Sequence, residues 1–468
     1  MLDFFPRYFS TRAIICYLVT LALVSSLFIN YAMPFQFMLF GLVSVIIFFV
    51  YSNKTTLRWR KYNPKTFKKK LFLSALVIRI VYVVFIYFYY IEVTGEPFMF
   101  GTGDEQFYQY MGSLMRTKGI SQVREEIKLY RVAFSDSGYC WWLGFVYSIF
   151  GDHVLSARLI KCVLNAFACV LMYNLAKCNF GEAAGRIAGV LCMLMPNMWF
   201  YCGVTLKEAE MAFLVILFVE RADLALRSKK ITIRNLLLPG LVILVMFTFR
   251  TALAAVLVAA LAAAIILSSG KQIETWKKIL YISVFSVWMF LTVGVEIVED
   301  TQRLWEGRGE NQSIGYEEKA SRSGGNTFFK YASATTMAPL IFTIPLSTMV
   351  EIPHQQNQMM LHGGNFIKNV LSGLTIFALI SMLISGEWRK HVLPIAVTCG
   401  YLVVIVFSVF AHSERFHFPV LALELMFAAY GITLLKNKHK RWFMMWLVFV
   451  CLANVAWAWI KLAGRGWT

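Results

Sequence analysis

The sequence predicts an all-α, polytopic membrane protein. Apolar residues make up 59% of its 468 residues and charged residues only 15%, whereas a soluble domain is roughly 25% charged. The apolar residues form continuous runs, unlike the alternating pattern of a membrane β-barrel. Together these observations argue against a soluble enzyme, a disordered chain and a disulfide-stapled scaffold.

The transmembrane helices follow from the lengths of the apolar runs. A membrane-spanning helix needs about 20 predominantly apolar residues. Such runs predict about thirteen helices, at residues 12–31, 35–51, 71–92, 155–176, 184–202, 209–226, 235–249, 252–269, 279–297, 366–385, 391–410, 418–435 and 442–460. The two short runs that flank Arg250 fit either two helices joined by a tight turn or one long helix with a buried charge.

The orientation follows from the basic residues, which give a net charge of +19. Lys and Arg gather in five short connections, within residues 54–70, 227–234, 271–278, 389–390 and 436–441. All five fall on one side when the helices are counted as above, and the positive-inside rule makes that side cytoplasmic. The charge therefore indicates membrane lipids rather than nucleic acid as a partner. We expect a multi-pass integral protein of a bacterial inner membrane.

The predicted topology divides the chain into four parts. Residues 1–70 hold two transmembrane helices and a basic cytoplasmic loop, and residues 71–297 form a transmembrane core whose first extracytoplasmic loop is 93–154. Residues 298–365 form a second extracytoplasmic loop, and 366–468 the last transmembrane helices.

Three segments of the extracytoplasmic loops are predicted to lie on or in the membrane without crossing it. Residues 104–118 read as an amphipathic surface helix with Phe107, Met111, Leu114 and Met115 on one face, closed by Gly119. The apolar runs 139–150 and 335–350 are too short to span and are expected to be interfacial or re-entrant.

The first candidate for chemistry is the acidic pair Asp104 and Glu105, at the start of the predicted surface helix. Acids are favoured in the first turn of any helix, where the macrodipole is positive. A carboxylate at the membrane surface can also act as a general base on an acceptor hydroxyl, or hold a divalent metal ion. The sequence does not require a metal and identifies no cofactor.

The cations near the same face are the second group of candidates. Lys207 and Glu208 lie at the outer end of a span, where such residues often only snorkel to the surface. Arg158 and Lys161 lie at the outer end of the fourth span, where Arg158 either anchors the helix to headgroups or binds substrate. Arg250 has no acidic neighbour in sequence, so it must reach the surface, a phosphate or a distant carboxylate.

The last cluster, residues 411–419, combines His412, Glu414, Arg415 and His417 directly before a span. A phosphate-binding role for Arg415 is favoured, with His412 beside it as a substrate-binding candidate. A metal site built on the histidines would need ligands that converge in space, which one short loop does not establish.

These acids and bases gather at one membrane face, which suits chemistry on an amphiphile with an anionic head and a lipid tail. A polyprenyl phosphate bearing a sugar is such a substrate: the cations would stabilise the departing phosphate and the carboxylate would activate the nucleophile. An ion-coupled transporter would use similar groups near the midplane. Acids are nearly absent from the centres of the predicted spans, which favours surface chemistry over transport.

Three stretches of the chain resemble the GT-C glycosyltransferases of the protein mannosyltransferase and aminoarabinose transferase type. The first is the Gly103–Tyr108 segment after a span, which is similar to the family's acidic motif in its first large extracytoplasmic loop. The second runs from Gly138 through Phe150-Gly151, Ala157-Arg158-Leu159 and Asn165 to Phe180-Gly181 and a helix with Pro196. The third is Ser413–Pro419 before a late span. The resemblance covers residues 71–270 and, more loosely, 411–436.

The resemblance implies transfer of a sugar from a polyprenyl-phosphate carrier to an acceptor hydroxyl on the extracytoplasmic face, with inversion at the anomeric carbon. By position, Asp104 would be the base with Glu105 beside it, and Lys207, Arg250 and Arg415 would face the carrier phosphate. The acceptor would be a glycan, a lipid or a protein. The sequence departs from the family in its two additional N-terminal spans and in its lack of a soluble C-terminal domain, so nothing indicates how the acceptor is chosen.

Two alternative functions remain at this stage. A polysaccharide polymerase or O-antigen ligase would use the later loop, 298–365, with His354 and His362. A flippase or transporter of lipid-linked sugars would move the substrate without forming a glycosidic bond.

Overall fold

The molecule is a bundle of long apolar helices, seen in a computed structural model that describes residues 2–101, 103–119, 121–122, 125–126, 134–228, 233–268, 338–408 and 412–463. Its helices are α1 (Arg7–Leu27), α2 (Phe35–Trp59), α3 (Pro64–Thr94), α4 (Gly103–Lys118), α6 (Phe134–Phe150), α7 (Val154–Leu194), α8 (Pro196–Phe200), α9 (Glu208–Arg227), α10 (Ile233–Phe249), α11 (Thr251–Leu267), α15 (Gln356–Ser385), α16 (Val392–Val406), α17 (Glu414–Thr433) and α18 (His439–Ala463). The described residues thus confirm the predicted all-α membrane class.

The predicted spans coincide with helices wherever the structure describes them. Seven described helices are long and apolar enough to cross a membrane, namely α1, α2, α3, α7, α15, α17 and α18, and the apolar parts of α10, α11 and α16 are shorter. Helix α9 is not among them, because Glu210, Glu220, Arg221 and Asp223 interrupt the predicted span 209–226. The predicted span 279–297 lies outside the described residues, so the exact number of spans stays a prediction.

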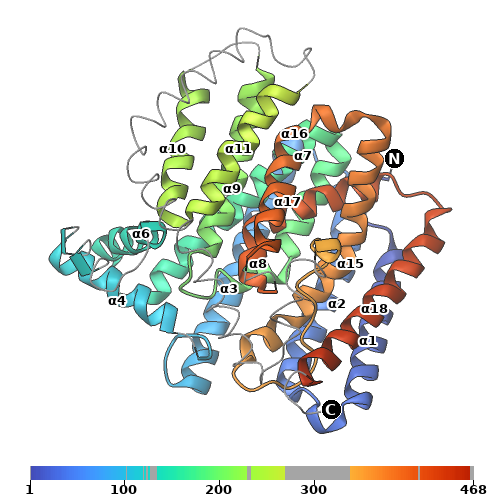
Figure 1. Ribbon diagram of the computed structural model, residues 1–468, viewed down its shortest axis with the longest axis horizontal. Helices are drawn as coiled ribbons and strands as arrows, with labels where there is room; N and C mark the ends of the chain where they lie inside the picture. Colours follow the sequence, from blue (N-terminus) through green and yellow to red (C-terminus); the bar gives the residue numbers. More distant parts are fainter. Residues whose placement is uncertain are drawn as a thin grey trace.

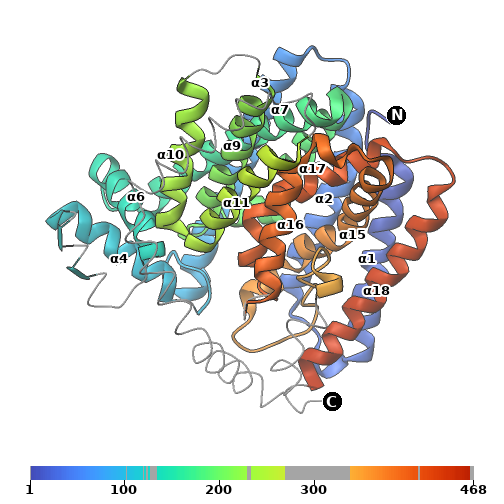
Figure 2. The same cartoon turned by 45° about the horizontal axis from the view of Figure 1, so that its top comes forward.

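The bundle is arranged around α17, which is buried over nearly its whole length. Helices α7, α9, α15 and α16 pack against it. Helices α1 and α18 lie side by side at one edge, and α4 and α6 lie together at the opposite edge (Figures 1 and 2). The outer helices present large apolar side chains to the surroundings, including Leu27, Val81 and Leu452, each more than 60% exposed. Such a surface belongs in lipid.

Helix α7 contains the predicted span 155–176 and the first part of the predicted span 184–202, and its two arms meet at a sharp bend. Gly181 has φ 89° inside the helix, a backbone conformation that residues with a Cβ rarely adopt. The two arms fold back on each other, because the Sγ atoms of Cys169 and Cys192 lie 3.7 Å apart. The boundary that the sequence placed between two spans is therefore a tight reversal rather than a loop.

The predicted surface helix is confirmed as α4. Met111 and Leu114 on its apolar face are buried and Phe107 and Met115 pack against the core. The helix ends before Gly119, which has φ 84°. The apolar run 139–150 belongs to α6, which packs along α4. Both helices lie at the rim of the bundle, as expected for interfacial elements.

The short apolar segment at 338–350 enters the bundle without forming a long helix. After one 3₁₀ turn, Ala338–Leu340, its backbone is irregular and buried. Asn369 donates to the carbonyls of Thr343 and Pro345, and Asn454 accepts from the amide of Ser347 at 2.7 Å. Irregular backbone is tolerated at membrane depth only where protein groups satisfy it, which agrees with the predicted re-entrant character.

The basic connections that the structure describes lie together at one end of the bundle, and the predicted connection 271–278 lies outside the described residues. Arg186 donates to the carbonyls of Trp59, Arg60 and Tyr62 at 2.7–3.0 Å, and Arg227 donates to the carbonyl of Lys390 at 2.8 Å. The loop 436–441 joins the same end through Lys440, which lies 5.1 Å from the ring of Tyr8 at the start of α1. The ends of α3 and α10 and the starts of α4, α9, α11 and α17 therefore belong to the other end.

Small residues allow α2 and α15 to approach closely. A Cβ on Gly363 would lie 2.7 Å from both Cα and O of Gly41, and a Cβ on Gly41 would lie 2.0 Å from the ring of His362. Without a hydrophobic driving force in lipid, helices associate through such close backbone packing. These glycines thus bring together two helices that both lie outside the resembling region.

We predict that Gly363→Ala destabilises the protein, because the new methyl group must push α2 away from α15. Overpacking of this kind costs about 1–3 kcal/mol. Gly400→Ala on α16 is the matched control, since its Cβ would meet Val256 at an ordinary 3.5 Å. Thermal unfolding in detergent micelles measures both variants. Equal midpoints for Gly363→Ala and the wild type would show that the helices are free to separate.

Candidate functional site

Four charged residues from four parts of the chain form a continuous chain of ion pairs at the end opposite the basic connections. Arg415 donates to Asp104 through Nη1 and to Glu208 through Nε, the latter at 2.5 Å. Nη2 of Arg250 lies 3.7 Å from the same oxygen of Glu208. We call Asp104, Arg415, Glu208 and Arg250, in this order, the charge chain. All four were candidates from the sequence, and the structure brings them together.

Helix ends position the members of the charge chain. Asp104 and Glu208 lie in the first turns of α4 and α9, where the macrodipole favours an acid. Arg415 lies in the first turn of α17, where the same dipole disfavours a cation, so its two carboxylate partners offset that cost. Arg250 has extended backbone, φ −163°, between α10 and α11. The sequence allowed two arrangements around Arg250. The structure shows the first of them, in which two helices, α10 and α11, are joined by a tight turn.

The charge chain passes from solvent into the protein interior. The side chain of Asp104 is 56% exposed, that of Arg415 23%, and that of Glu208 0%. The guanidinium of Arg250 lies 4.4 Å from the ring of Phe416 and donates to the hydroxyl of Tyr401 at 3.1 Å. Arg250 therefore reaches a distant carboxylate, one of the three destinations that the sequence allowed.

A second ion pair, Lys207 with Asp136, lies beside the charge chain. The ammonium of Lys207 contacts Asp136 and donates to the carbonyl of Phe249 at 2.6 Å. Burial lowers the pKa of Lys207, and Asp136 opposes that shift. The hydroxyl of Tyr108 donates to Asp136 at 3.2 Å. Lys207 is thus buried and paired, rather than a cation that snorkels to the surface.

Asp136 is the residue of this site that sequence reasoning missed. It lies two residues before Gly138, where the second resembling stretch begins, and in the first turn of α6. An acid directly before an apolar run was the available signal. Its partner, Lys207, is 71 residues away in sequence, and no local pattern indicates that pairing.

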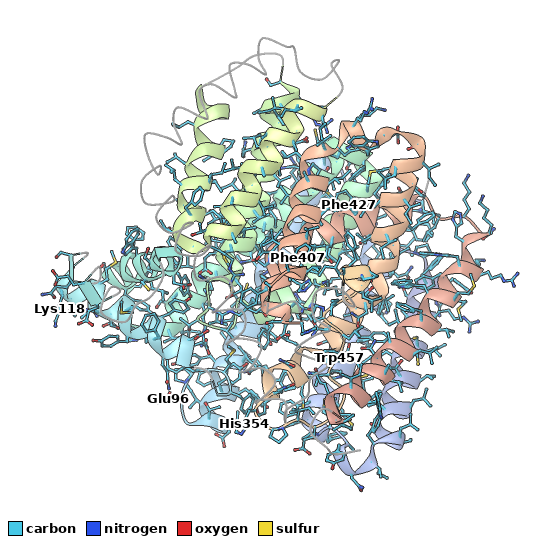
Figure 3. The ribbon with its side chains drawn as sticks, in the orientation of Figure 1. Glu96, Lys118, His354, Phe407, Phe427 and Trp457 are labelled. Atoms are coloured by element: carbon cyan, nitrogen blue, oxygen red, sulfur yellow. The ribbon has the colours of Figure 1, made fainter. Side chains whose placement is uncertain are left out.

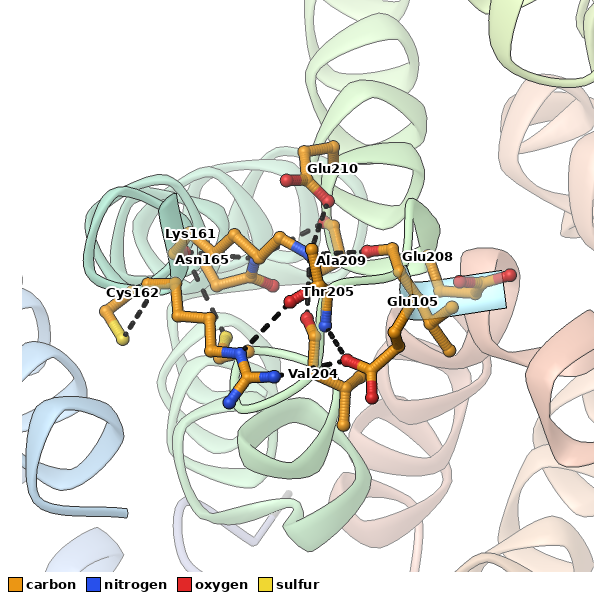
Figure 4. Close-up of polar contacts among 12 residues, drawn as sticks. Glu105, Lys161, Cys162, Asn165, Val204, Thr205, Glu208, Ala209 and Glu210 are labelled. Atoms are coloured by element: carbon orange, nitrogen blue, oxygen red, sulfur yellow. Dashed lines mark hydrogen bonds and ion pairs between the residues drawn. The ribbon is translucent and has the colours of Figure 1, made fainter. Parts of the chain in front are cut away.

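Glu105 differs from its neighbour Asp104 in its exposure to solvent and in its ion-pair partner. Its carboxylate is fully buried and pairs with Arg158 at 3.2 Å. It also accepts hydrogen bonds from the amides of Met99, at 2.6 Å, and Thr205. Figure 4 shows the contact of Glu105 with the backbone amide of Thr205. The expected pair of catalytic acids is therefore divided, because successive helical residues point in different directions.

The side chain of Arg158 also lies in the protein interior and donates hydrogen bonds to protein groups there. Besides Glu105, it donates to the carbonyl of Pro97 at 2.5 Å and to the hydroxyl of Thr205 at 3.3 Å. Its side chain is fully buried. This arrangement ties the 97–105 segment, α7 and the 201–207 loop together, and Nη1 of Arg158 has no hydrogen-bond partner among the described residues. The substrate contact expected from the sequence stays a prediction.

The side chains of Arg415, His412 and His417, which are close in sequence, contact three different parts of the protein. Arg415 joins the charge chain, whereas the ring of His412 lies 5.7 Å from that of Trp457 on α18. His417 is buried, with Nδ1 3.2 Å from the ammonium of Lys368, which in turn lies 3.6 Å from Glu424. Among the described residues no group of three or more His, Cys, Asp or Glu side chains is arranged to hold a metal ion.

Comparisons with known proteins agree with the predicted resemblance. A family model described as dolichyl-phosphate-mannose-protein mannosyltransferase matches residues 138–295, and one described as the Alg9-like mannosyltransferase family matches residues 341–462. No curated protein sequence matches the chain. These matches confirm the resemblance to the GT-C membrane glycosyltransferases, over residues 138–295 and 341–462.

Two solved structures also match the chain. They are crystal structures of ArnT from Cupriavidus metallidurans, one in the apo state and one bound to undecaprenyl phosphate. The identities are 12% and 13%, the TM-score is 0.46 for each, and the alignments cover 83% of this chain and 71% of ArnT.

We predict that Glu105 and Asp104 differ sharply in their contribution to stability. Glu105→Ala leaves Arg158 buried without its carboxylate, which costs about 3–5 kcal/mol. Asp104→Ala removes one half-exposed ion pair, which is worth about 1 kcal/mol or less. Thermal unfolding of both variants in the same detergent measures the difference. Similar midpoints for the two variants would contradict the separation of the two acids into different roles.

Proposed function

We propose that the protein transfers a sugar from a polyprenyl-phosphate-linked donor to an acceptor hydroxyl at the extracytoplasmic surface, with inversion and with Asp104 as the base. The observation that carries this proposal is the charge chain. A candidate base on the first loop contacts a candidate phosphate-binding arginine on a late helix, 311 residues away in sequence. The lipid-phosphate donor is supported by the match to a family described by its dolichyl-phosphate-mannose donor.

The cations of the site suit a leaving phosphate. Arg415, Arg250 and Lys207 come from three different elements and lie around Glu208 and Phe249. A guanidinium has five N–H donors in a planar fork that matches phosphate oxygens. The ion pairs of Arg415 within the described residues use Nε and Nη1, so a phosphate would approach its remaining amino group. Low local dielectric would strengthen that contact.

Asp104 is placed for general-base catalysis. Its exposed carboxylate would accept the proton of the acceptor hydroxyl while the hydroxyl oxygen forms a bond to the anomeric carbon. The bond between that carbon and the phosphate oxygen breaks, and its electron pair leaves on the phosphate, next to the cations. Attack from the face opposite the phosphate inverts the configuration. The contact between Asp104 and Arg415 keeps base and leaving-group site within a sugar's width.

The other candidates receive different roles in this scheme. Glu208 would orient both arginines, because it touches each of them. Glu105 and Arg158 would be positioning residues that hold the start of α4, and His412 would contribute only if substrate extends toward α18. Since the charge chain lies opposite the basic connections, the positive-inside rule supports an extracytoplasmic site in a bacterial inner membrane.

The later loop offers less support for the alternative enzyme. His362, one of its two histidines, is fully buried and its Nε2 lies 2.8 Å from the hydroxyl of Tyr17. Its Nδ1 lies 2.6 Å from the carbonyl of Met359. His362 therefore packs in the core, and residues 298–337 of that loop lie outside the described residues.

Asp104→Asn should reduce transfer by about 10²–10⁴-fold, since that is the usual contribution of a general base. The measurement is sugar transfer from a synthetic polyprenyl-phosphate donor by protein reconstituted in nanodiscs. The matched control is Glu96→Gln, another exposed acid of the same loop, which accepts from Gln106 at 2.6 Å (Figure 3). Unchanged transfer by Asp104→Asn would move the site to the later loop, and movement of donor without a new glycosidic bond would indicate a transporter.

Arg415→Lys should lower kcat/KM for the lipid donor by about 10–100-fold, because a lysine cannot bridge two carboxylates and a phosphate in one plane. Arg60→Lys at the basic end is the control, since Arg60 is a half-exposed arginine paired with Asp3 at 3.7 Å. Both variants are assayed over a range of donor concentrations. A parallel loss in both variants would mean that general surface charge, and not the charge chain, controls donor use.

A further inference from the structure

The middle of α3 carries a buried arginine whose partners among the described residues include no carboxylate. Arg79 is fully buried, and its helix is long and apolar enough to cross a membrane. Within the described residues, its guanidinium contacts three backbone carbonyls and one thiol. A cation inside a membrane span is costly unless a partner balances its charge.

The backbone accounts for the three carbonyl contacts of Arg79. Nη1 donates to the carbonyl of Ala75 at 3.2 Å and lies 3.5 Å from that of Met193, and Nη2 donates to the carbonyl of Cys192 at 3.2 Å. In a continuous helix the carbonyl of Cys192 would accept from residue 196, which is proline and has no N–H. Arg79 therefore supplies a missing donor, but these carbonyls do not balance its charge.

The fourth contact is with Cys169, whose Sγ atom lies 3.4 Å from Nη2 of Arg79. Nε of Arg79 is buried and has no hydrogen-bond partner among the described residues. A neighbouring guanidinium favours the thiolate over the thiol, and a thiolate would supply the missing negative charge. A neutral Cys169 would instead donate to the carbonyl of Asn165, one turn back, at 3.4 Å. The two forms differ in reactivity, because the thiolate is the nucleophile in disulfide chemistry.

A second thiol is in contact with Cys169. The Sγ atom of Cys192, on the other arm of α7, lies 3.7 Å from that of Cys169, and both thiols are free and fully buried. Cys162 and Cys202 form a small cluster with Val83, one turn further along α3. Their described hydrogen bonds go to backbone carbonyls and not to the guanidinium. The molecule thus offers two pairs of thiols, of which one touches the cation.

We propose that Arg79, Cys169 and Cys192 form a redox-active site, in which Cys169 is a thiolate paired with Arg79 and Cys192 is the resolving thiol. The oxidant has to be a small, membrane-permeant two-electron acceptor such as an azo compound, because the thiols are buried. The site shares no residue with the charge chain, and the assignment does not depend on the proposed sugar transfer.

The reaction proceeds in two steps. The sulfur of Cys169 attacks one nitrogen of the azo bond, and the other nitrogen takes a proton from water. The sulfur of Cys192 then attacks that of Cys169, the S–N bond breaks, and the departing nitrogen takes the proton of Cys192. An S–S bond has formed, the two sulfurs have lost two electrons, and the azo group leaves reduced as a hydrazine. The disulfide joins the two arms of α7.

The test follows disulfide formation in the full-length protein in nanodiscs. Protein is treated with the azo oxidant diamide for increasing times, the remaining thiols are alkylated after denaturation, and tryptic peptides are analysed by mass spectrometry. Trypsin cuts between Cys169 and Cys192, after Lys177 and Arg186. The disulfide therefore appears as one linked peptide mass.

The matched control is the pair of thiols that does not touch the guanidinium. Because Cys162 and Cys202 fall on the same two peptides, the test variant is Cys162→Ala/Cys202→Ala and the control is Cys169→Ala/Cys192→Ala. At neutral pH the Cys169–Cys192 link should form at least about tenfold faster than the Cys162–Cys202 link, since an ordinary thiol is mostly protonated there. Equal rates, or faster oxidation of the control pair, would overturn the assignment.

Variants of Arg79 test the role of the cation. In the test variant, Arg79→Gln should slow formation of the link about tenfold, whereas Arg79→Lys keeps the charge and should retain most of the rate. Thermal unfolding checks that both are folded. The pH at which the rate levels off needs no change at Arg79, and it should be lower for Cys169–Cys192 than for the control pair. An unchanged rate in folded Arg79→Gln, or the same pH profile for both pairs, would show that Cys169 is an ordinary thiol.

Discussion

The arrangement of this end of the molecule depends on Arg415. A guanidinium in the first turn of α17 opposes the dipole of its own helix, and the side chain of Arg415 is only 23% exposed. Two carboxylates, Asp104 and Glu208, compensate for this cost. Because they come from α4 and α9, their attraction to one cation fixes the surface helix against the bundle. These ion pairs thus link the first loop to the late helix, in addition to the apolar packing of α4 along α6.

The ion pairs near the site fall into two kinds that differ in how well they are satisfied. Glu105 receives hydrogen bonds from Arg158 and two backbone amides, so nothing further is needed to stabilise its charge. Among the described residues, Oε2 of Glu208 and both oxygens of Glu210 have no hydrogen-bond partner. Buried carboxylates that accept several hydrogen bonds hold a structure together, whereas buried acceptors without donors leave room for a further partner.

Hydropathy and charge were sufficient to predict the architecture, because lipid imposes strong constraints on a chain. Long apolar runs have to become helices, and basic loops have to share a side. Gly181, between two predicted spans, marks the reversal of α7 as its φ of 89° requires. The charge-chain residues were identifiable for the same reason, since an isolated charge such as Arg250 beside an apolar run demands a partner. That reasoning identified candidates but not pairings.

The sequence could not predict which way each acidic side chain points, toward solvent or into the protein. Asp104 and Glu105 are adjacent and chemically alike, yet one faces solvent and the other is sealed against Arg158. Only the register of α4 on α6 and α7 decides which acid is which, and that register depends on contacts between distant segments. Asp136 and Glu210 escaped notice for a related reason: an acid in a helix's first turn has a sufficient local explanation in the macrodipole. A local explanation does not exclude a second role, and here the partners Lys207 and Lys161, each buried, supply the evidence for one.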